Sequence, residues 1–244
     1  MEFLKFSRLF NLQSLFVTIV SLGSCFFAIT YEIEYNYDLL LLNLAITFPL
    51  SFSIQAAFRR RERALEYLGV FKSSLMAVHQ VLQFEKGLAS RQKDESRKLL
   101  QKVADHLLGW LTNPNLSIKE INKEMDEIFV FIKENKKQIS DSIVQRVIRY
   151  MKDTHRGATF LISMLRHPTV KGLRMYCIFF IYLYSLVNAP VLLHHIGFED
   201  TWLVYLICFT SSLLLVTLYN IQEQMENPFD GSGLDDIKLQ DFRL

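Results

Sequence analysis

Four long hydrophobic stretches divide the chain, and none of them contains Asp, Glu, Lys or Arg. They cover residues 12–30, 39–58, 175–193 and 202–219. An α-helix needs about 20 predominantly apolar residues to cross the hydrocarbon core of a bilayer. The pattern therefore predicts an integral membrane protein with four transmembrane helices.

The segment between the second and third stretches, residues 59–174, has a different pattern. Its apolar residues recur at helical spacing, and no Pro interrupts the run from Arg59 to Phe84. We therefore expect the second transmembrane helix to continue into this segment as one long helix. A further helix is expected over residues 94–111, where the sequence Asn-Pro-Asn follows at 113–115 and ends it.

Two more helices are predicted from capping signals. Ser117 and Glu120 have the spacing of a capping box, in which two side chains satisfy N–H groups at the start of a helix. Ser140 or Asp141 is expected to cap a fourth helix, which Pro168 ends. Strands have almost no support. The predicted fold class is thus an all-α membrane protein with four transmembrane helices and a cytosolic helical bundle.

These elements divide the chain into four predicted parts. An N-terminal transmembrane hairpin covers residues 1–58, and a cytosolic helical domain covers residues 59–174. A second transmembrane hairpin covers residues 175–219, and residues 220–244 form a cytosolic tail.

The charged residues predict the orientation of these parts. The connections 31–38 and 194–200 carry five acidic residues and no Lys or Arg. Because basic residues stay on the cytosolic side of a membrane, we expect both termini and the middle segment to be cytosolic. Of the 25 acids, 20 remain on that side against 27 bases, which gives it a formal charge of +7. Such a charge attracts anions.

The sequence lacks the common signatures of catalysis. No Gly-rich phosphate loop, HExxH, GxSxG or metal-spaced Cys/His set occurs, so we expect no enzymatic activity and no catalytic residue. We interpret the adjacent His194 and His195 as a polar pair at the membrane interface rather than a metal site. Buried small side chains, without a disulfide, are expected at Cys25, Cys177 and Cys208. The predicted spans contain no Asp, Glu, Lys or Arg, which argues against a secondary transporter and leaves a passive pore or a passive anchor.

The second transmembrane stretch bears on that choice. Pro49 lies in its middle, where the freed backbone groups need a neighbouring helix or water. Thr47, Ser51 and Gln55 form a polar stripe at i, i+4, i+8, and an aromatic stripe lies beside it. These residues are either ordinary helix contacts, with Ser and Thr bonded to carbonyls, or the lining of a pore with a dry, apolar neck.

Three sequence fragments resemble the bestrophin family. "FPLSF" at 48–52 resembles the Pro-x-Ser-Phe pattern of the neck helix in animal bestrophins, and "ENPFDGSGLDD" at 226–236 resembles the Asn-Pro-Phe and acidic turn after their last span. "RHPTVKGLRMY" at 166–176 is also similar to bestrophin-like proteins. The resemblance implies a homopentameric channel for chloride and related monovalent anions such as bicarbonate. Its expected partners are membrane lipid and these anions, without nucleic acid.

A different class of function stays open beside the channel. The chain could serve as a membrane scaffold or signalling protein whose cytosolic helical domain binds a partner. In that case the second transmembrane helix would face lipid and line no pore.

The resemblance places the pore neck on this helix in one of two registers. Alignment on Pro-x-Ser-Phe assigns the neck to Phe48, Phe52 and Ala56. Alignment of Phe58-Arg59 with the Phe-Arg of bacterial relatives assigns it instead to Leu50, Ile54 and Phe58. The first register is favoured because a proline match inside a helix arises less often by chance. The inner mouth, which would collect anions, is expected at Arg59, Arg60, Arg61 and Arg63.

The tail raises the question of a metal. In animal bestrophins the Asn-Pro-Phe motif and the acids after it belong to a calcium-binding clasp. The positions that match or approximate its ligands are Gln224, Asn227, Asp230, Asp235 and Asp236. Calcium, a hard cation that prefers oxygen ligands, is therefore a candidate cofactor. The alternative is a helix stop, in which Asn227 and Pro228 end the helix and Phe229 packs against the cytosolic bundle.

Overall fold

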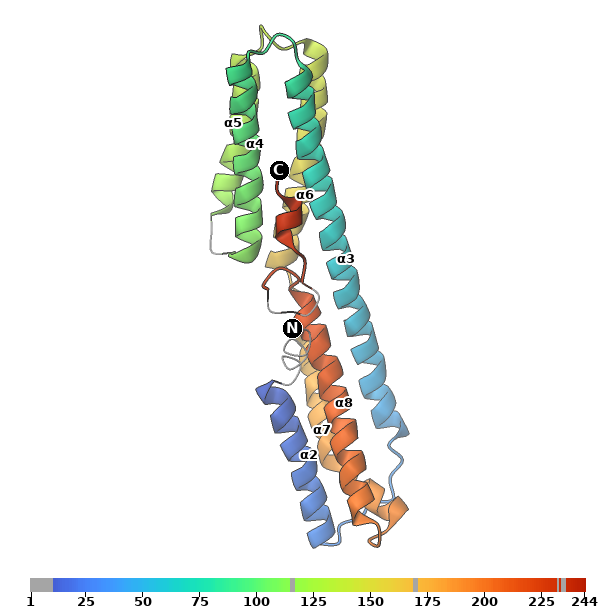
Figure 1. Ribbon diagram of the computed structural model, residues 1–244. Coiled ribbons are helices and arrows are strands. Elements are labelled where there is room, and N and C mark those ends of the chain that lie inside the picture. Colours follow the sequence, from blue (N-terminus) through green and yellow to red (C-terminus); the bar gives the residue numbers. More distant parts are fainter. Residues whose placement is uncertain (1–10, 115–116, 169–170, 232, 234–235) are drawn as a thin grey trace. The chain divides into compact units, whose positions relative to one another are not determined.

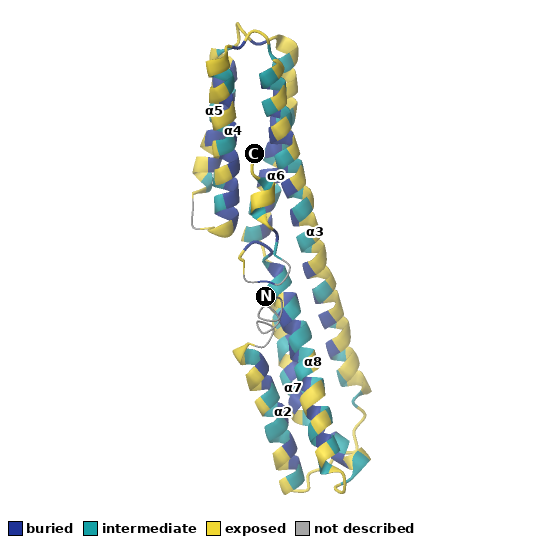
Figure 2. Cartoon of the chain, viewed as in Figure 1, coloured by how far each residue is buried: buried dark blue, intermediate teal, exposed yellow. Residues whose placement is uncertain are grey.

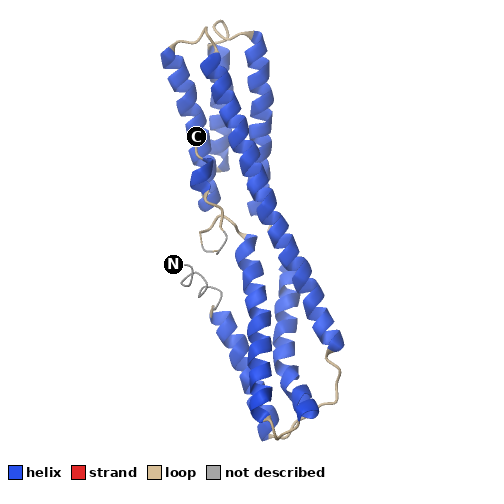
Figure 3. Ribbon diagram, turned by 45° about the vertical axis from the view of Figure 1, so that its right-hand side comes forward, coloured by secondary structure: helices blue, strands red, loops and turns tan. Residues whose placement is uncertain are grey.

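A computed structural model describes residues 11–114, 117–168, 171–231, 233 and 236–244. These residues form seven α-helices and one short 3-10 helix, without a strand among them, which confirms the all-α prediction (Figure 3). The α-helices are α2 (Leu12–Thr30), α3 (Leu40–Phe84), α4 (Ser90–Thr112), α5 (Ile118–Glu134), α6 (Asp141–Arg166), α7 (Lys171–Ile196) and α8 (Thr201–Glu226). The 3-10 helix η2 covers Leu239–Phe242.

The chain divides into two compact units. The first consists of Met1–Arg59 and Thr169–Glu226, and the second of Arg60–Pro168 and Asn227–Leu244. Each unit combines segments that are far apart in the sequence. The long helix α3 contributes its first part to one unit and its remainder to the other.

The first unit contains the helices that are apolar enough to cross a membrane. Among the described residues, four helices meet this criterion, namely α2, α3, α7 and α8, and they contain the four predicted spans. Helices α2, α7 and α8 lie side by side (Figure 1). Ser21 on α2 donates a 3.1 Å hydrogen bond to the carbonyl of Cys208 on α8, and Ser24 donates a 2.6 Å bond to the carbonyl of Leu186 on α7. Short hydroxyl side chains of this kind allow transmembrane helices to approach closely.

The three cysteines are free thiols buried within this unit, as predicted. Cys25 and Cys208 belong to one apolar cluster with Ala28, Ala189 and Leu193, and Cys177 belongs to another. They act as small hydrophobic side chains in the packing of the helices.

The second unit is a helical bundle made of α4, α5, α6 and the later part of α3. Its core consists of the apolar positions that recur at helical spacing in the sequence, and Figure 2 shows buried and exposed residues interspersed along these helices. Gly157 on α6 lies so close to α3 that an added Cβ would be 3.0 Å from the carbonyl oxygen of Tyr67. Thr154 on α6 donates a 2.9 Å hydrogen bond to the Oγ of Ser74 on α3. A small residue and a matched polar pair thus set the approach of these two helices.

Most predicted helix ends agree with the structure, but α4 begins at Ser90 and not at the predicted residue 94, and the capping chemistry also differs. Helix α3 is continuous to Phe84, and α6 ends at Arg166, just before His167 and Pro168. Ser117 and Ser140 occupy the positions before α5 and α6, yet neither side chain accepts a hydrogen bond from a backbone N–H of the helix it precedes. The prediction of a capping box at Ser117 is therefore wrong, because its hydrogen bond is absent. The predicted start of α5 is correct.

Candidate pore-lining site

One face of the transmembrane part of α3 is occupied by packing within the chain. Leu50 is only 3 % exposed and belongs with Ile46 to an apolar cluster. The cluster also contains Val17 of α2, Cys177 and Ile181 of α7, and Val216 and Tyr219 of α8. Ile54, one turn after Leu50, packs against the same cluster. These side chains hold α3 to the other transmembrane helices.

A different face of the same helix is exposed. Phe48 and Phe52 are 57 % and 63 % exposed, and their rings stack with centroids 6.5 Å apart and planes 21° apart. Ala56, one turn further on, is also exposed. The structure therefore brings the three residues of the first neck register onto one continuous, unoccupied face of a single chain.

The second neck register is divided between the two environments. Its first member, Leu50, is buried in the cluster, Ile54 is partly buried against it, and Phe58 is 48 % exposed. Three residues spaced at i, i+4, i+8 would need one common exposed face to line a pore.

The polar stripe is exposed as well. Thr47, Ser51 and Gln55 are all exposed and adjoin the aromatic face. Pro49 lies inside α3 and lacks an N–H, so the carbonyl of Ala45 loses its usual helical donor. This part of α3 thus presents one apolar stripe and one polar stripe that the other described residues do not cover.

The four arginines after this stretch lie in different environments. Arg59 and Arg63 are exposed. Arg60 is partly buried, and its guanidinium donates hydrogen bonds to the backbone carbonyls of Met164 and His167 at the end of α6. Arg60 thus satisfies carbonyl groups that a helix leaves free at its C-terminus. The exposed charge that could attract an anion is carried by Arg59 and Arg63 together with the partly exposed Arg61.

The tail contains the predicted helix stop. Helix α8 ends at Glu226, immediately before Asn227 and Pro228. Phe229 is buried in the core of the second unit, and the N–H of Ile237 donates a 2.9 Å hydrogen bond to the carbonyl of Pro228, which closes the turn. The prediction that this motif stops the helix and that Phe229 packs on the bundle is confirmed.

The predicted calcium ligands are only partly brought together. Asp230 lies close enough to Asp236 to act on its carboxyl, and the N–H of Gly233 donates a 3.0 Å hydrogen bond to Asp236 Oδ2. Burial first, and then the charge of Asp230, raise the pKa of Asp236. The Oδ1 of Asn227 is buried without a hydrogen-bond partner among the described residues. Gln224 lies in the last turn of α8, and Asp235 lies outside the described residues.

These groups are a partial set for a metal. Calcium takes six to eight oxygen ligands in proteins. Within the described residues the turn offers two carboxylates and one amide oxygen, and no group of three or more acidic, His or Cys side chains is present in that part of the chain. Calcium binding therefore remains a prediction.

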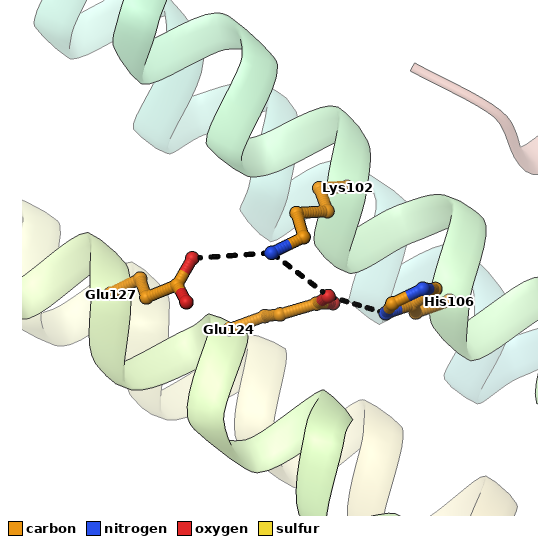
Figure 4. Close-up of polar contacts among 4 residues, drawn as sticks. All are labelled: Lys102, His106, Glu124 and Glu127. Carbon is orange, nitrogen blue, oxygen red and sulfur yellow. Dashed lines mark hydrogen bonds and ion pairs between the residues drawn. The ribbon is translucent and has the colours of Figure 1, made fainter. Parts of the chain in front are cut away.

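A polar cluster that the sequence analysis missed joins α4 and α5 (Figure 4). Lys102 Nζ lies 3.3 Å from Oε1 of the buried Glu124 and 3.4 Å from Oε2 of Glu127, and His106 Nδ1 contacts the same oxygen of Glu124. The hydrogen bond that Lys102 donates to Glu124 raises the pKa of Lys102. Glu124 interrupts the buried apolar positions of α5, and an acid on such a stripe needs a partner, so the sequence did carry a signal.

The two adjacent histidines in the last turn of α7 do not form a metal site with described neighbours. His194 Nδ1 lies 3.6 Å from Glu34 Oε2, and the rings of His194 and His195 are 5.5 Å apart at an angle of 68°. Described residues near them do not supply a third ligand. This arrangement agrees with the interpretation as a polar pair.

Comparison with known proteins identifies the fold. No known protein family matches the sequence, and no curated protein is significantly similar to it. Among solved structures, a crystal structure of a membrane protein aligns with a TM-score of 0.79 and 14 % identity, over 94 % of this chain and 93 % of that chain. Two structures of a bacterial bestrophin homolog from Klebsiella pneumoniae align with TM-scores of 0.73 and 0.74 at 16 % identity. They cover 94 % and 97 % of this chain, and 92 % and 96 % of their own.

The resemblance to bestrophins in sequence fragments is thus confirmed for the fold of the whole chain. Together with four described helices of sufficient length and apolarity, the similarity to a membrane protein over 94 % of the chain identifies it as an integral membrane protein.

Proposed function

We propose that this chain, which has the fold of bacterial bestrophin homologs, is a subunit of a passive anion channel whose neck is lined by the transmembrane part of α3. The proposed permeant ions are chloride and related monovalent anions such as bicarbonate. Its role is conduction, without a catalytic step.

The observation that carries this proposal is the exposed stripe of Phe48, Phe52 and Ala56. The chain packs Leu50 and Ile54 against its own helices and leaves the aromatic stripe uncovered. Apolar constrictions can control conduction because water leaves them readily. The positive edges of aromatic rings are also more favourable to an anion than to a cation.

The polar stripe beside the aromatic face favours water over lipid. Thr47, Ser51 and Gln55 are exposed at the same depth as the phenylalanines. Polar side chains within a membrane normally face a protein interior or a water-filled cavity. A face that combines an apolar stripe with an exposed Gln is therefore better suited to a pore than to hydrocarbon.

A channel of this kind requires several copies of the chain. A single α3 cannot enclose a pore, so copies must be arranged around a closed axis. The sequence resemblance argues for five. Each copy would contribute Arg59 and Arg63 to a basic ring at the cytosolic mouth, in keeping with an orientation that has both termini in the cytosol.

Purified protein reconstituted in liposomes tests the proposal. Under a potassium chloride gradient, we expect the reversal potential to follow the chloride gradient. A reversal potential that follows potassium would contradict anion selectivity, and a monomeric mass in mild detergent would contradict the channel itself. With a monomeric mass, the scaffold or signalling function would become the better explanation.

A further inference from the structure

The second unit contains a cavity of about 260 Å³ that the proposed channel does not use. Its walls are formed by α3, α4 and the end of the chain after η2. Three of its side chains are basic: Lys72 on α3, Arg97 on α4 and Arg243 after η2. The described residues that line it include no Asp or Glu. The cavity is therefore a local concentration of positive charge.

The basic side chains are only weakly neutralised by their surroundings. Arg97 and Lys72 form no ion pair with a described acid, and Lys72 Nζ donates instead to the backbone carbonyl of Asp241. Arg243 Nε lies 3.7 Å from Asp105 Oδ1, a long contact between two largely exposed side chains. Exposed pairs of this kind contribute little, so most of the positive charge remains available to a ligand.

The cavity also has an unsatisfied polar atom and an apolar wall. His79 lines it from α3, and its Nδ1 is buried without a hydrogen-bond partner among the described residues. Met76, Leu100 and Leu244 supply apolar surface. Buried polar atoms usually have a partner, and a single orphan beside a cavity is a place where a ligand or an ordered water can bind.

The walls are held in place by contacts between the elements. Gln83 Nε2 on α3 donates a 3.2 Å hydrogen bond to the carbonyl of Lys93 on α4. The contact of Lys72 with Asp241 links η2 to α3, and Leu239, Phe242 and Leu244 pack against the apolar core of the unit. The elements that carry the basic groups are thus held around the cavity by the fold.

We propose that this cavity binds a small organic anion, with one anionic group and a short apolar portion. The planar guanidinium of Arg97 suits a carboxylate or phosphate group, since its donors match two oxygens at once. Met76 and Leu100 contact the apolar portion. The volume lies slightly below the usual range for small-molecule pockets, which favours compact ligands. This site is independent of the proposed pore.

Binding of two short-chain probes to the full-length protein in mild detergent tests the proposal. Hexanoate and hexyl phosphate carry the two anionic groups on the same apolar chain, and hexanamide is the neutral control. Titration calorimetry should detect one or both anions and show at least about tenfold weaker binding for hexanamide, as expected when a charge-assisted hydrogen bond is lost. The anion with the lower dissociation constant identifies the preferred anionic group. Equal binding of hexanamide, or no binding of either anion, would overturn the proposal.

Three variants separate the site from general attraction to a basic surface. Arg97→Gln should weaken binding of the anion at least about tenfold, whereas Arg91→Gln removes a cation from α4 outside the cavity and should leave it unchanged. Met76→Trp keeps every charge but fills the cavity, and it should also abolish binding. An Arg97→Gln protein that binds like the wild type, or a Met76→Trp protein that does so, would contradict the assignment.

Discussion

The guanidinium of Arg60 donates a 3.1 Å hydrogen bond to the backbone carbonyl of His167, 107 residues further along the chain. A second hydrogen bond goes to the carbonyl of Met164. The last carbonyls of a helix have no partner within the helix, and here a charged side chain from α3 supplies one. The interaction also complements the negative end of the helix dipole of α6.

Replacement of Arg60 by Gln should therefore destabilise the second unit. Both carbonyls would lose a charged donor, with an expected cost on the order of 2–3 kcal/mol. Thermal or denaturant unfolding in mild detergent measures this cost. Unchanged stability in the Arg60→Gln protein would show that the contact with α6 contributes nothing to the fold.

Arg59 and Arg63 are expected to behave in the opposite way. Both are exposed, so Arg59→Gln combined with Arg63→Gln should change stability by no more than about 0.5 kcal/mol. If they collect anions at the pore mouth, the same double variant should lower chloride conductance at low ionic strength. Added salt should reduce the difference from the wild type, because it screens exposed charges. Single-channel current of both proteins at two salt concentrations decides the question. If the double variant and the wild type have the same conductance at each concentration, the two arginines do not collect anions.

The neck is tested by replacing Phe48 and Phe52 with Ala together. Each ring would face its symmetry copies in the proposed channel, so the double variant should widen the constriction. An anion could then pass with more of its water, and we expect a higher current and weaker discrimination among halides. Planar bilayer recordings with chloride, bromide and iodide measure both quantities.

Leu50 and Ile54 provide the matched control for this experiment. They lie on the same helix but pack inside the chain, so Leu50→Ala with Ile54→Ala should lower stability by about 2–5 kcal/mol per buried residue and leave selectivity unchanged. Higher conductance in this pair, without an effect of the phenylalanine pair, would mean that the second neck register is correct. If neither pair affects permeation, α3 does not line the narrow part of a pore.

Much of the fold could be predicted because its signals are local. The four spans follow from uninterrupted apolar runs, and the length of α3 follows from helical spacing without Pro as far as Phe84. The end of α6 before Pro168 and the end of α8 before Pro228 follow from the restricted backbone of proline and its neighbour. Each of these signals is contained within a few turns of the chain.

The remaining features depend on contacts that a sequence pattern does not contain. The role of Arg60 requires a partner 107 residues away, and the capping of α6 depends on Glu85, which lies 55 residues before Ser140. The two neck registers have equally apolar residues, so their periodicity could not separate Leu50 from Phe52. Only the packing of α3 against the other transmembrane helices distinguishes the buried face from the exposed one.

Glu85 gives a prediction for the dependence of stability on pH. Its Oε2 accepts hydrogen bonds from the N–H and the hydroxyl of Ser140, and its Oε1 accepts from the N–H of Gly87. The bond from the Ser140 N–H, followed by that from Gly87, lowers the pKa of Glu85 below its ordinary value of 4.5. A carboxyl with a lowered pKa in the folded state adds stability above its ordinary pKa, and this contribution is lost as the pH falls through the lowered value.

Glu85→Gln should therefore reduce the melting temperature at pH 7 and have a progressively smaller effect below pH 4.5. Melting temperatures of the two proteins across this range provide the measurement. Glu66→Gln on α3, at an exposed position, controls for the general loss of one negative charge. A difference between wild type and Glu85→Gln that stays constant down to low pH would rule out the ionised carboxylate as the cap.

Stability measurements can distinguish the two explanations of the Asn-Pro-Phe motif, a calcium site and a helix stop. Asp236 is partly buried beside Asp230, and its raised pKa means that ionisation of this carboxyl costs more in the folded protein than in the unfolded chain. The N–H of Gly233 already occupies one of its oxygens, and an Asn at this position could still accept that hydrogen bond. Without a bound cation, Asp236→Asn should therefore raise the melting temperature, because it removes the repulsion from Asp230 and the cost of burying a charge.

Calcium would reverse this result. A bound cation offsets both the repulsion and the burial, so millimolar calcium would stabilise the wild type, and Asp236→Asn would abolish the effect. If the motif acts only as a helix stop, the melting temperature of the wild type should be the same in calcium and in a calcium chelator. A calcium-dependent increase in melting temperature that Asp236→Asn removes would establish the turn as a metal site. The buried Oδ1 of Asn227 would then be a candidate ligand of the calcium ion.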